Sequence, residues 1–267
     1  MSRGILLIGC GKMGGALLTG WIRQGIAAAD IVVVEPNPLP DLPAGIRHCQ
    51  SAEALPADFR PALAMLAVKP QAMAAVAPAY AALAASGTCF LSIAAGTTIA
   101  TLTRLLGGRA AVIRAMPNTP AAVGAGITVA CAGEGVTAEQ RQLCEQLLTA
   151  VGEVGWVDKE PLIDAVTAVS GSGPAYVFWL TECMAAAGEK AGLDKELAAR
   201  LARATVVGSG ALMRQSPESP EQLRRNVTSP NGTTQAALEV LMAPDGLAPL
   251  MERAVAAAAR RARELAG

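Results

Sequence analysis

The feature that most constrains the fold is a short apolar run followed at once by closely spaced glycines. Ile5–Ile8 is the apolar run, and Gly9, Gly11 and Gly14 follow it in the spacing G-x-G-x-x-G. From Met13 to Gln24 the apolar residues recur at helical intervals. The order strand, glycine turn, helix is the first part of a βαβ unit. An ordinary glycine-rich turn is the alternative, and the context near the N-terminus favours the first interpretation.

A turn of this kind is typical of dinucleotide binding. The first glycine permits a tight turn, the second lets the backbone approach a pyrophosphate, and the third lets the helix pack closely on the strand. The pyrophosphate is then expected at the helix N-terminus, where free N–H groups and the helix dipole favour an anion. The sequence therefore predicts cofactor-binding residues at Gly9, Cys10, Gly11, Lys12, Met13 and Gly14.

More apolar runs follow in the first half of the chain, separated by stretches rich in Ala and Leu. Strands that are apolar throughout, alternating with helices, indicate a parallel sheet covered on both faces. The sequence thus predicts an α/β fold, a doubly wound Rossmann-type domain over residues 1–157. Its strands after the first are expected at Ile31–Val34, Ala62–Val68, Phe90–Ile93 and Val112–Ile113, with less regular additions at Ile127–Ala130 and Val154–Val157.

Residues 158–267 show helical spacing almost throughout and no clear strand, so this part is predicted to be an all-α domain. Its helices are rich in alanine, which allows close helix approach, and a domain of this size has a limited core of its own. Both points favour helices from two subunits packing together, with a self-contained bundle as the alternative. The helices are expected at Leu162–Val169, Ala175–Ala191, Lys195–Arg214, Thr234–Met242 and Leu247–Leu265.

The composition excludes several kinds of function. Lys+Arg and Asp+Glu are equal at 22 each and aromatic residues make up only 3%, so neither nucleic acid nor an anionic membrane is an expected partner. His48 is the single histidine, which rules out a metal site built on several histidines, and it lies in a polar, loop-like stretch. The six cysteines form no CxxC pair, and no run is apolar enough to span a membrane. These features predict a cytoplasmic protein.

Ligands of doubly wound sheets bind at the carboxyl ends of the strands. Glu35 ends the second strand, where an acid accepts hydrogen bonds from an adenosine ribose and favours NAD over NADP; a solvated strand end is the alternative. Lys69 ends the third strand and could meet a cofactor phosphate or simply extend into water. Two prolines make Met116–Pro120 a rigid loop, predicted to line the nicotinamide. The predicted contacts at these ends are Glu35, Pro36, Ala67, Val68, Lys69, Pro70, Ala94, Ala95, Gly96, Met116, Pro117 and Asn118.

The second half contains two further dense clusters. Ser170–Ala175 places glycines and a proline inside a helical pattern, which suggests close packing or a functional kink. Asn226–Thr234 runs into a helix that is expected to begin near Gln235, with Thr233 as its N-cap. The hydroxyls and amides of this loop could hold a small carboxylate, although a simple capped loop would have the same pattern.

These motifs, in this order, resemble the pyrroline-5-carboxylate reductase family. The matching segments are Gly9–Gly14, Ala67–Pro70, Ser92–Gly96, Met116–Pro120, Ser170–Tyr176 and Val227–Thr234. The resemblance implies reduction of 1-pyrroline-5-carboxylate to L-proline with NADPH or NADH, by hydride transfer to a protonated cyclic imine. It also implies a homodimer with interleaved helical domains that can assemble further into a ring.

For the individual residues, the resemblance implies that Thr234 lies near the imine nitrogen and acts as the catalytic hydroxyl. It implies a substrate-binding set of Asn226, Val227, Ser229, Pro230, Asn231, Gly232, Thr233 and Thr234. Two positions depart from the family pattern. Asn231 stands where the family commonly has glycine, and asparagine tolerates the left-handed backbone that this turn requires. Glu35 stands where small or polar residues often receive a 2′-phosphate, so the cofactor is expected to be NADP or NAD with a preference for NAD.

Two other functions remain open at this point. A β-hydroxyacid dehydrogenase shares the same domain plan, but it would use a lysine from the first long helix, and Asp164–Ala187 contains none. A nucleotide-binding sensor without activity is the other alternative, and the intact loop ending in Thr234 argues against it.

Overall fold

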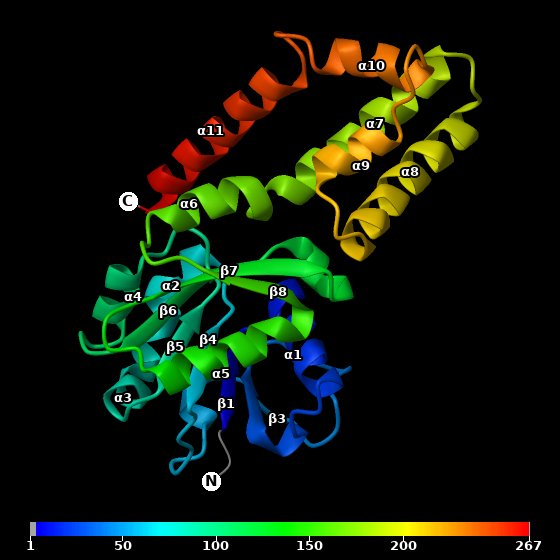
Figure 1. Cartoon of the computed structure of the whole chain (residues 1–267). Helices are drawn as coiled ribbons and strands as arrows, with labels where there is room; N and C mark the ends of the chain where they lie inside the picture. The colour runs from blue at the N-terminus through cyan, green and yellow to red at the C-terminus, as the bar shows by residue number, and fades with distance from the viewer. Residues whose placement is uncertain (1–3, 267) are drawn as a thin grey trace. The chain divides into compact units, whose positions relative to one another are not determined.

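Apolar four-residue segments rich in Ile, Leu and Val form the central strands of one sheet. The computed structural model describes residues 4–266, and this part of the chain contains an eight-stranded sheet in the order β3-β2-β1-β4-β5-β6-β7-β8 (Figure 1). The strands are β1 (Ile5–Ile8), β2 (Ile31–Val34), β3 (Arg47–Cys49), β4 (Leu63–Leu66), β5 (Cys89–Ser92), β6 (Ala111–Met116), β7 (Gly126–Ala132) and β8 (Gly152–Trp156).

Both faces of this sheet are buried, each under its own apolar cluster. Successive side chains of a strand point to opposite faces, so a strand such as β1 contributes to both clusters. Ile5 and Leu7 belong to one apolar cluster with Leu17 and Trp21, whereas Leu6 and Ile8 belong to another. The helices of this unit are α1 (Lys12–Arg23), α2 (Pro70–Val76), α3 (Ala81–Ala85), α4 (Ile99–Leu105), α5 (Ala138–Leu148) and α6 (Leu162–Val166). The predicted doubly wound architecture is therefore confirmed.

Pairing in the sheet is parallel except between β6 and β7, which are antiparallel. The connection from Pro117 to Ala125 explains this exception. It contains only the 3₁₀ turn η4 (Thr119–Val123), and a parallel return would need a longer crossover. The prediction of a wholly parallel sheet is wrong at this pair.

Strands β1 and β2 have the predicted bounds, and the other predicted strands differ by a few residues. Strand β3 was not predicted, because Arg47–Cys49 is short and carries polar side chains. His48 therefore lies in an edge strand and not in a loop; its Nε2 is 2.7 Å from the backbone oxygen of Glu35.

The helical part consists of α7 (Gly173–Lys190), α8 (Lys195–Gln215), α9 (Pro220–Asn226), α10 (Thr233–Leu241) and α11 (Leu247–Ala266). Helices α7 and α8 pack side by side, and a methyl group on Gly188 would lie 3.3 Å from the Ala198 side chain, so a small residue permits this approach. Helix α9 is an addition to the predicted set. It is short, but Ser219 caps it and Pro220 begins it.

The chain divides into two compact units. Among the described residues, the first contains 4–171 and 258–266, and the second is Ser172–Ala257. This division falls later than the predicted boundary at residue 157, because α6 and the π-helical turn η6 (Thr167–Gly171) pack on the sheet through Ile163 and Ala168, both buried. The end of α11 also belongs to the first unit.

Candidate active site

The carboxyl edge of the sheet brings most of the predicted cofactor residues into one unit. Strand β1 pairs in parallel with both β2 and β4, so the chain order reverses at β1. In open α/β sheets, ligands bind beside such a reversal, outside the carboxyl ends of the strands. The segments that begin at Gly9, Glu35, Ala67 and Ile93, together with Met116 at the end of β6, all lie along this edge.

The turn after β1 has the backbone geometry that its glycines predict. Gly9 has φ +88°, and a methyl group there would lie 2.9 Å from the carbonyl oxygen of Ala67. A methyl group on Gly14 would overlap the carbonyl oxygen of Gly9. A methyl group on Gly11 would meet no atom within 4 Å, so the space in front of the helix N-terminus is open. The turn therefore fits a pyrophosphate, whose charge the first N–H groups of α1 would stabilise.

Glu35 is fastened to this turn. One carboxylate oxygen accepts a 2.9 Å hydrogen bond from the Cys10 backbone N–H, and the other accepts 3.2 and 2.8 Å bonds from the backbone and side chain of Asn37. Partial burial opposes ionisation of Glu35, but these hydrogen bonds outweigh it and lower the pKa of the carboxyl below its usual value. The ionised carboxylate has lone pairs left to accept hydrogen bonds from ribose hydroxyls.

Cys10 is predicted as a cofactor contact, and it lies half-buried beside this carboxylate. Burial, and then the negative charge of Glu35, raise the pKa of the Cys10 thiol. The side chain therefore stays neutral, and its backbone N–H is the group that is engaged, with Glu35.

A cavity of about 560 Å³ opens between the glycine turn and the first turns of α2. Its lining includes the predicted residues Gly9, Gly11, Glu35, Pro36, Ala67, Val68 and Lys69. Lys69 is exposed at the start of α2, so its ammonium group can meet an anion or solvent there. The cavity also takes in residues that sequence reasoning missed: Asn37, Gln50, Ser51, Glu53 and Tyr80. Those after β3 would have been found had that strand been recognised, because they lie at the same edge of the sheet.

Other predicted contacts lie beside this cavity. Pro70, Ala95 and Gly96 line a second cavity of about 420 Å³. Gly96 has φ +71°, and a methyl group on it would lie 2.9 Å from the carbonyl oxygen of Leu265, so the end of α11 rests on this turn. Cys10, Lys12, Met13, Gly14, Ala94, Met116, Pro117 and Asn118 do not line either cavity.

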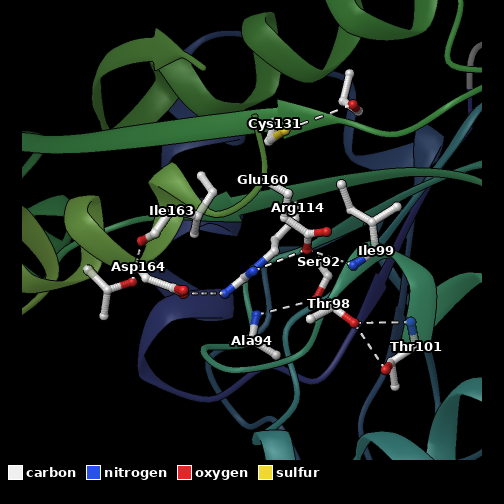
Figure 2. A network of polar contacts seen from close by, with 12 residues as sticks. Ser92, Ala94, Thr98, Ile99, Thr101, Arg114, Cys131, Glu160, Ile163 and Asp164 are labelled. Atoms are coloured by element: carbon white, nitrogen blue, oxygen red, sulfur yellow. Dashed lines mark hydrogen bonds and ion pairs between the residues drawn. The ribbon is translucent and has the colours of Figure 1, made fainter. Parts of the chain in front are cut away.

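The loop after β6 is firmly held. The side-chain oxygen of Asn118 accepts a 3.0 Å hydrogen bond from the Ile127 N–H, which closes the loop onto β7, and Pro117 is buried. Arg114, two residues before Met116, is buried and pairs with two carboxylates: Glu160 at 3.1 Å and Asp164 at 3.5 Å (Figure 2). Glu160 also accepts a 2.8 Å bond from the Ile99 N–H at the start of α4. This ion-pair cluster joins β6, α4 and α6.

The loop predicted to hold substrate lies in the second unit, whereas the predicted cofactor residues lie in the first. Asn231 has φ +59°, so asparagine adopts the left-handed backbone that the sequence required of it. Thr233 is not the N-cap of α10: Gly232 occupies that position and Thr233 begins the helix. Thr234 is half-buried in the first turn.

The remaining loop residues differ in how far they are engaged. The side chain of Asn226 bonds Glu218 and Gln222 at 2.9 and 2.8 Å, so it stabilises α9. Val227, Ser229, Pro230 and Asn231 are exposed, and the Asn231 N–H donates to Gln235.

The part of the chain that the structure describes contains no cluster of three or more His, Cys, Asp or Glu that could bind a metal. No helix within residues 4–266 is both long and apolar enough to cross a membrane.

Comparison with known proteins matches one family model to each half of the chain. Residues 160–265 match the family model "Pyrroline-5-carboxylate reductase dimerisation", and residues 4–96 match "NADP oxidoreductase coenzyme F420-dependent". The chain is 42% identical to a pyrroline-5-carboxylate reductase of Pseudomonas aeruginosa over 98% of this chain and 96% of that one. It is 37% identical to one of Mycobacterium tuberculosis, again over 98% and 96%.

Solved structures agree with these relatives. A pyrroline-5-carboxylate reductase from Coxiella burnetii superposes with a TM-score of 0.93 at 34% identity, covering 100% of both chains. A pyrroline carboxylate reductase from Plasmodium falciparum, solved with NADP bound, superposes with a TM-score of 0.83 at 27% identity, covering 99% of this chain and 98% of that one.

The glycine turn, the carboxyl-edge cavity and the helical part together define an oxidoreductase with a Rossmann-type NAD(P)-binding domain and a helical dimerisation domain. Within that class, the chain belongs to the pyrroline-5-carboxylate reductase family.

Proposed function

We propose that this chain binds a nicotinamide cofactor through residues 1–157 and uses the loop Asn226–Thr234 to hold 1-pyrroline-5-carboxylate, which it reduces to L-proline. The observation that carries the proposal is the joint presence of the glycine turn, open in front of Gly11, and a left-handed Asn231 that preserves the turn before Thr234. Neither the β-hydroxyacid dehydrogenase nor the sensor without activity accounts for that second feature.

Reduction of a cyclic imine needs neither a strong acid nor a metal from the protein. A protonated imine is already a good electrophile, and a bound nicotinamide supplies the hydride, so orientation is the main task. Backbone N–H groups of the loop would fix the substrate carboxylate, as at other helix N-termini. The Thr234 hydroxyl would orient the ring nitrogen. The hydroxyl is in the first turn of α10, directly after the loop, which suits that role.

For the cofactor, we propose that NADH is used at least as well as NADPH. The ionised Glu35 carboxylate lies at the rim of the cavity, and Pro36 and Asn37 follow it in place of a basic residue. A 2′-phosphate near this carboxylate would be repelled. The Plasmodium falciparum relative was solved with NADP, so the difference would be a property of this chain's own residues.

For the assembly, we propose an interleaved homodimer built on residues 158–267, with the ring of dimers that the resemblance implies as a further step. Helices α7, α9 and α10 contain no buried residue in the single chain. Phe178 and Trp179 on α7 are 61% and 65% exposed, and Val240 on α10 is 72% exposed. Apolar faces of this kind on a soluble enzyme's helices mark an association surface.

One assay tests the reaction. Oxidation of NADH and of NADPH is followed at 340 nm with 1-pyrroline-5-carboxylate, and L-proline is identified as the product. A panel of β-hydroxyacids is run in the oxidative direction beside it. We expect activity with the imine alone; turnover of a hydroxyacid, or cofactor binding without any turnover, would contradict the proposal.

A further inference from the structure

The π-helical turn Thr167–Gly171 touches the edge of the sheet at Met116. A methyl group built on Gly171 would lie 2.5 Å from Met116 Cε and 3.7 Å from Met116 Cγ. Gly171 does not have a positive φ, so backbone conformation does not require glycine there. A larger residue there would displace the tip of the methionine side chain.

The π geometry has a local cause. Thr167 Oγ1 donates a 2.7 Å hydrogen bond to the carbonyl oxygen of Ile163, and Ser170 Oγ donates a 3.0 Å bond to that of Val166. Hydroxyls that bond to carbonyls one turn earlier bend a helix away from its regular ladder. Single π turns are frequent at functional sites. In this one, Gly171 faces Met116 of the sheet, and Ile163 and Ala168 of the same segment are buried.

The ion-pair cluster fixes this segment relative to the strand that carries Met116. Arg114 belongs to β6, two residues before Met116, and Asp164 belongs to α6, directly before the π turn. Arg114 is 3% exposed and the Asp164 side chain 10% exposed, so this ion pair is shielded from solvent, whereas the Glu160 side chain is 24% exposed (Figure 2). Strand β6 and helix α6 are therefore held to each other through Arg114 and Asp164, on the N-terminal side of the Met116 contact in both segments.

We propose that Gly171 is a positioning residue for Met116: by leaving room for the methionine side chain, it sets the wall against which the reactive ring of the cofactor lies. The proposal rests on the proposed function for the role of that ring, but the contact itself does not. Met116 is a half-buried side chain at the carboxyl edge, and its tip is the only part of it that Gly171 constrains.

Gly171→Ala is the direct test, because the atom it would displace is the far end of a flexible side chain. We expect the fold to survive with a melting temperature within about 2 °C of wild type, since the methionine tip can turn aside at little cost. The effect should fall on kcat, which we expect to drop by about tenfold to a hundredfold, the scale of a small misplacement at a reacting centre. The Kd for NADH should change by less than about threefold, because the adenosine half of the cofactor is held elsewhere.

A second measurement needs no cofactor. With ¹³C-methyl-labelled methionine, the Met116 resonance is assigned from its loss in Met116→Ala. Gly171→Ala should shift that resonance in the free protein. Gly173→Ala is the matched control, since a methyl group there meets no atom within 4 Å, and it should leave the resonance in place. In the Met116→Ala background, Gly171→Ala should cause no further loss of kcat.

An unshifted resonance would show that the contact is absent and would overturn the proposal. A shifted resonance with unchanged kcat would overturn the positioning role. If Gly171→Ala lowers kcat by the same factor in the Met116→Ala background as in wild type, Gly171 acts through residues other than Met116. If wild type itself lacks imine reductase activity while the resonance still shifts, the proposed function is wrong but the contact between Gly171 and Met116 is confirmed.

Discussion

The two units of the chain differ in how completely they bury their apolar residues. In the first, strands β1, β2, β4 and β5 are buried at every position, and two apolar clusters cover the two faces of the sheet. In the second, only Ala198 and Ala202 are buried, both small residues on α8. The first unit thus has a complete core within one chain, whereas the second leaves many of its large apolar side chains exposed.

The difference in burial suits the two units to different roles. A complete core suits a unit that must hold a glycine turn and a carboxylate rim in fixed geometry, because a close-packed interior leaves its side chains little room to move. An incomplete core suits a unit whose structure is finished by a second copy, because exposed apolar area is the main source of association free energy. The comparison therefore predicts that cofactor binding is a property of one chain, and that catalysis requires two.

The largest effect is expected from charging the exposed face of the helical unit. Trp179→Glu would place a carboxylate on the proposed interface, which costs several kcal/mol if it is buried there. We expect a monomer of 27.1 kDa by sedimentation equilibrium at low micromolar concentration, with activity reduced at least a hundredfold. Val123→Glu is the matched control, since Val123 is 77% exposed in the first unit. A Trp179→Glu protein that sediments and reacts as wild type would refute the interface on α7.

Thr234→Val should impair catalysis without impairing cofactor binding. The substitution keeps the side-chain shape and removes the hydroxyl. We expect kcat/KM for the imine to fall by roughly ten- to a thousandfold, the scale of one hydrogen bond in a positioned site. The Kd for NADH should barely change, because the proposed cofactor contacts lie in the first unit. Steady-state kinetics and fluorescence titration measure the two quantities.

The control for that variant is Thr181→Val, where the lost hydroxyl donates to the carbonyl oxygen of Val177 at 2.8 Å, one turn earlier on α7. It should retain kcat/KM. Wild-type kinetics in Thr234→Val would show that the loop acts through its backbone amides alone, and unfolding of that variant would show that its role is structural.

Sequence reasoning was strongest where one local rule decides the structure. The glycine turn could be predicted residue by residue, because only glycine fits the φ of Gly9 and the close approach at Gly14. The left-handed backbone at Asn231 was expected from the family resemblance, because the family commonly has glycine at this position. Strands β1 and β2 were found at their observed bounds because they are apolar throughout.

Sequence reasoning was weakest where tertiary contacts decide the structure. Strand β3 carries too few apolar residues to stand out, so the cavity lining after it was missed. The N-cap of α10 was placed one residue late because threonine is the better capping side chain, although the loop ends at Gly232. No sequence rule places Gly171 against Met116, since the two lie far apart in the chain and meet only when α6 packs on the sheet.

A smaller effect is expected in the cofactor preference, and it should be confined to the first unit. Wild type should use NADH at least as well as NADPH. Glu35→Ser should raise the ratio of kcat/KM for NADPH over NADH by about ten- to a hundredfold, the equivalent of roughly 1–3 kcal/mol of repulsion removed. Asp41→Ser, an exposed acid that does not line the cavity, is the control and should leave the ratio unchanged. A tenfold or greater preference for NADPH in wild type would contradict the role given to Glu35.

The smallest effect concerns the stability of the same unit. The pKa of Glu35 is lowered in the folded chain, so its ionised form stabilises the fold above the pKa of the unfolded chain, and this contribution is lost as the pH falls through the lower, folded pKa. Glu35→Gln keeps one acceptor for the Cys10 N–H and removes the charge. We expect it to lower the free energy of unfolding by at most about 1 kcal/mol at pH 7, with a smaller deficit at pH 4. Urea unfolding at the two pH values measures it, with Asp41→Asn as the control. A deficit that does not change between them would mean that the charge of Glu35 adds nothing to the stability of the turn.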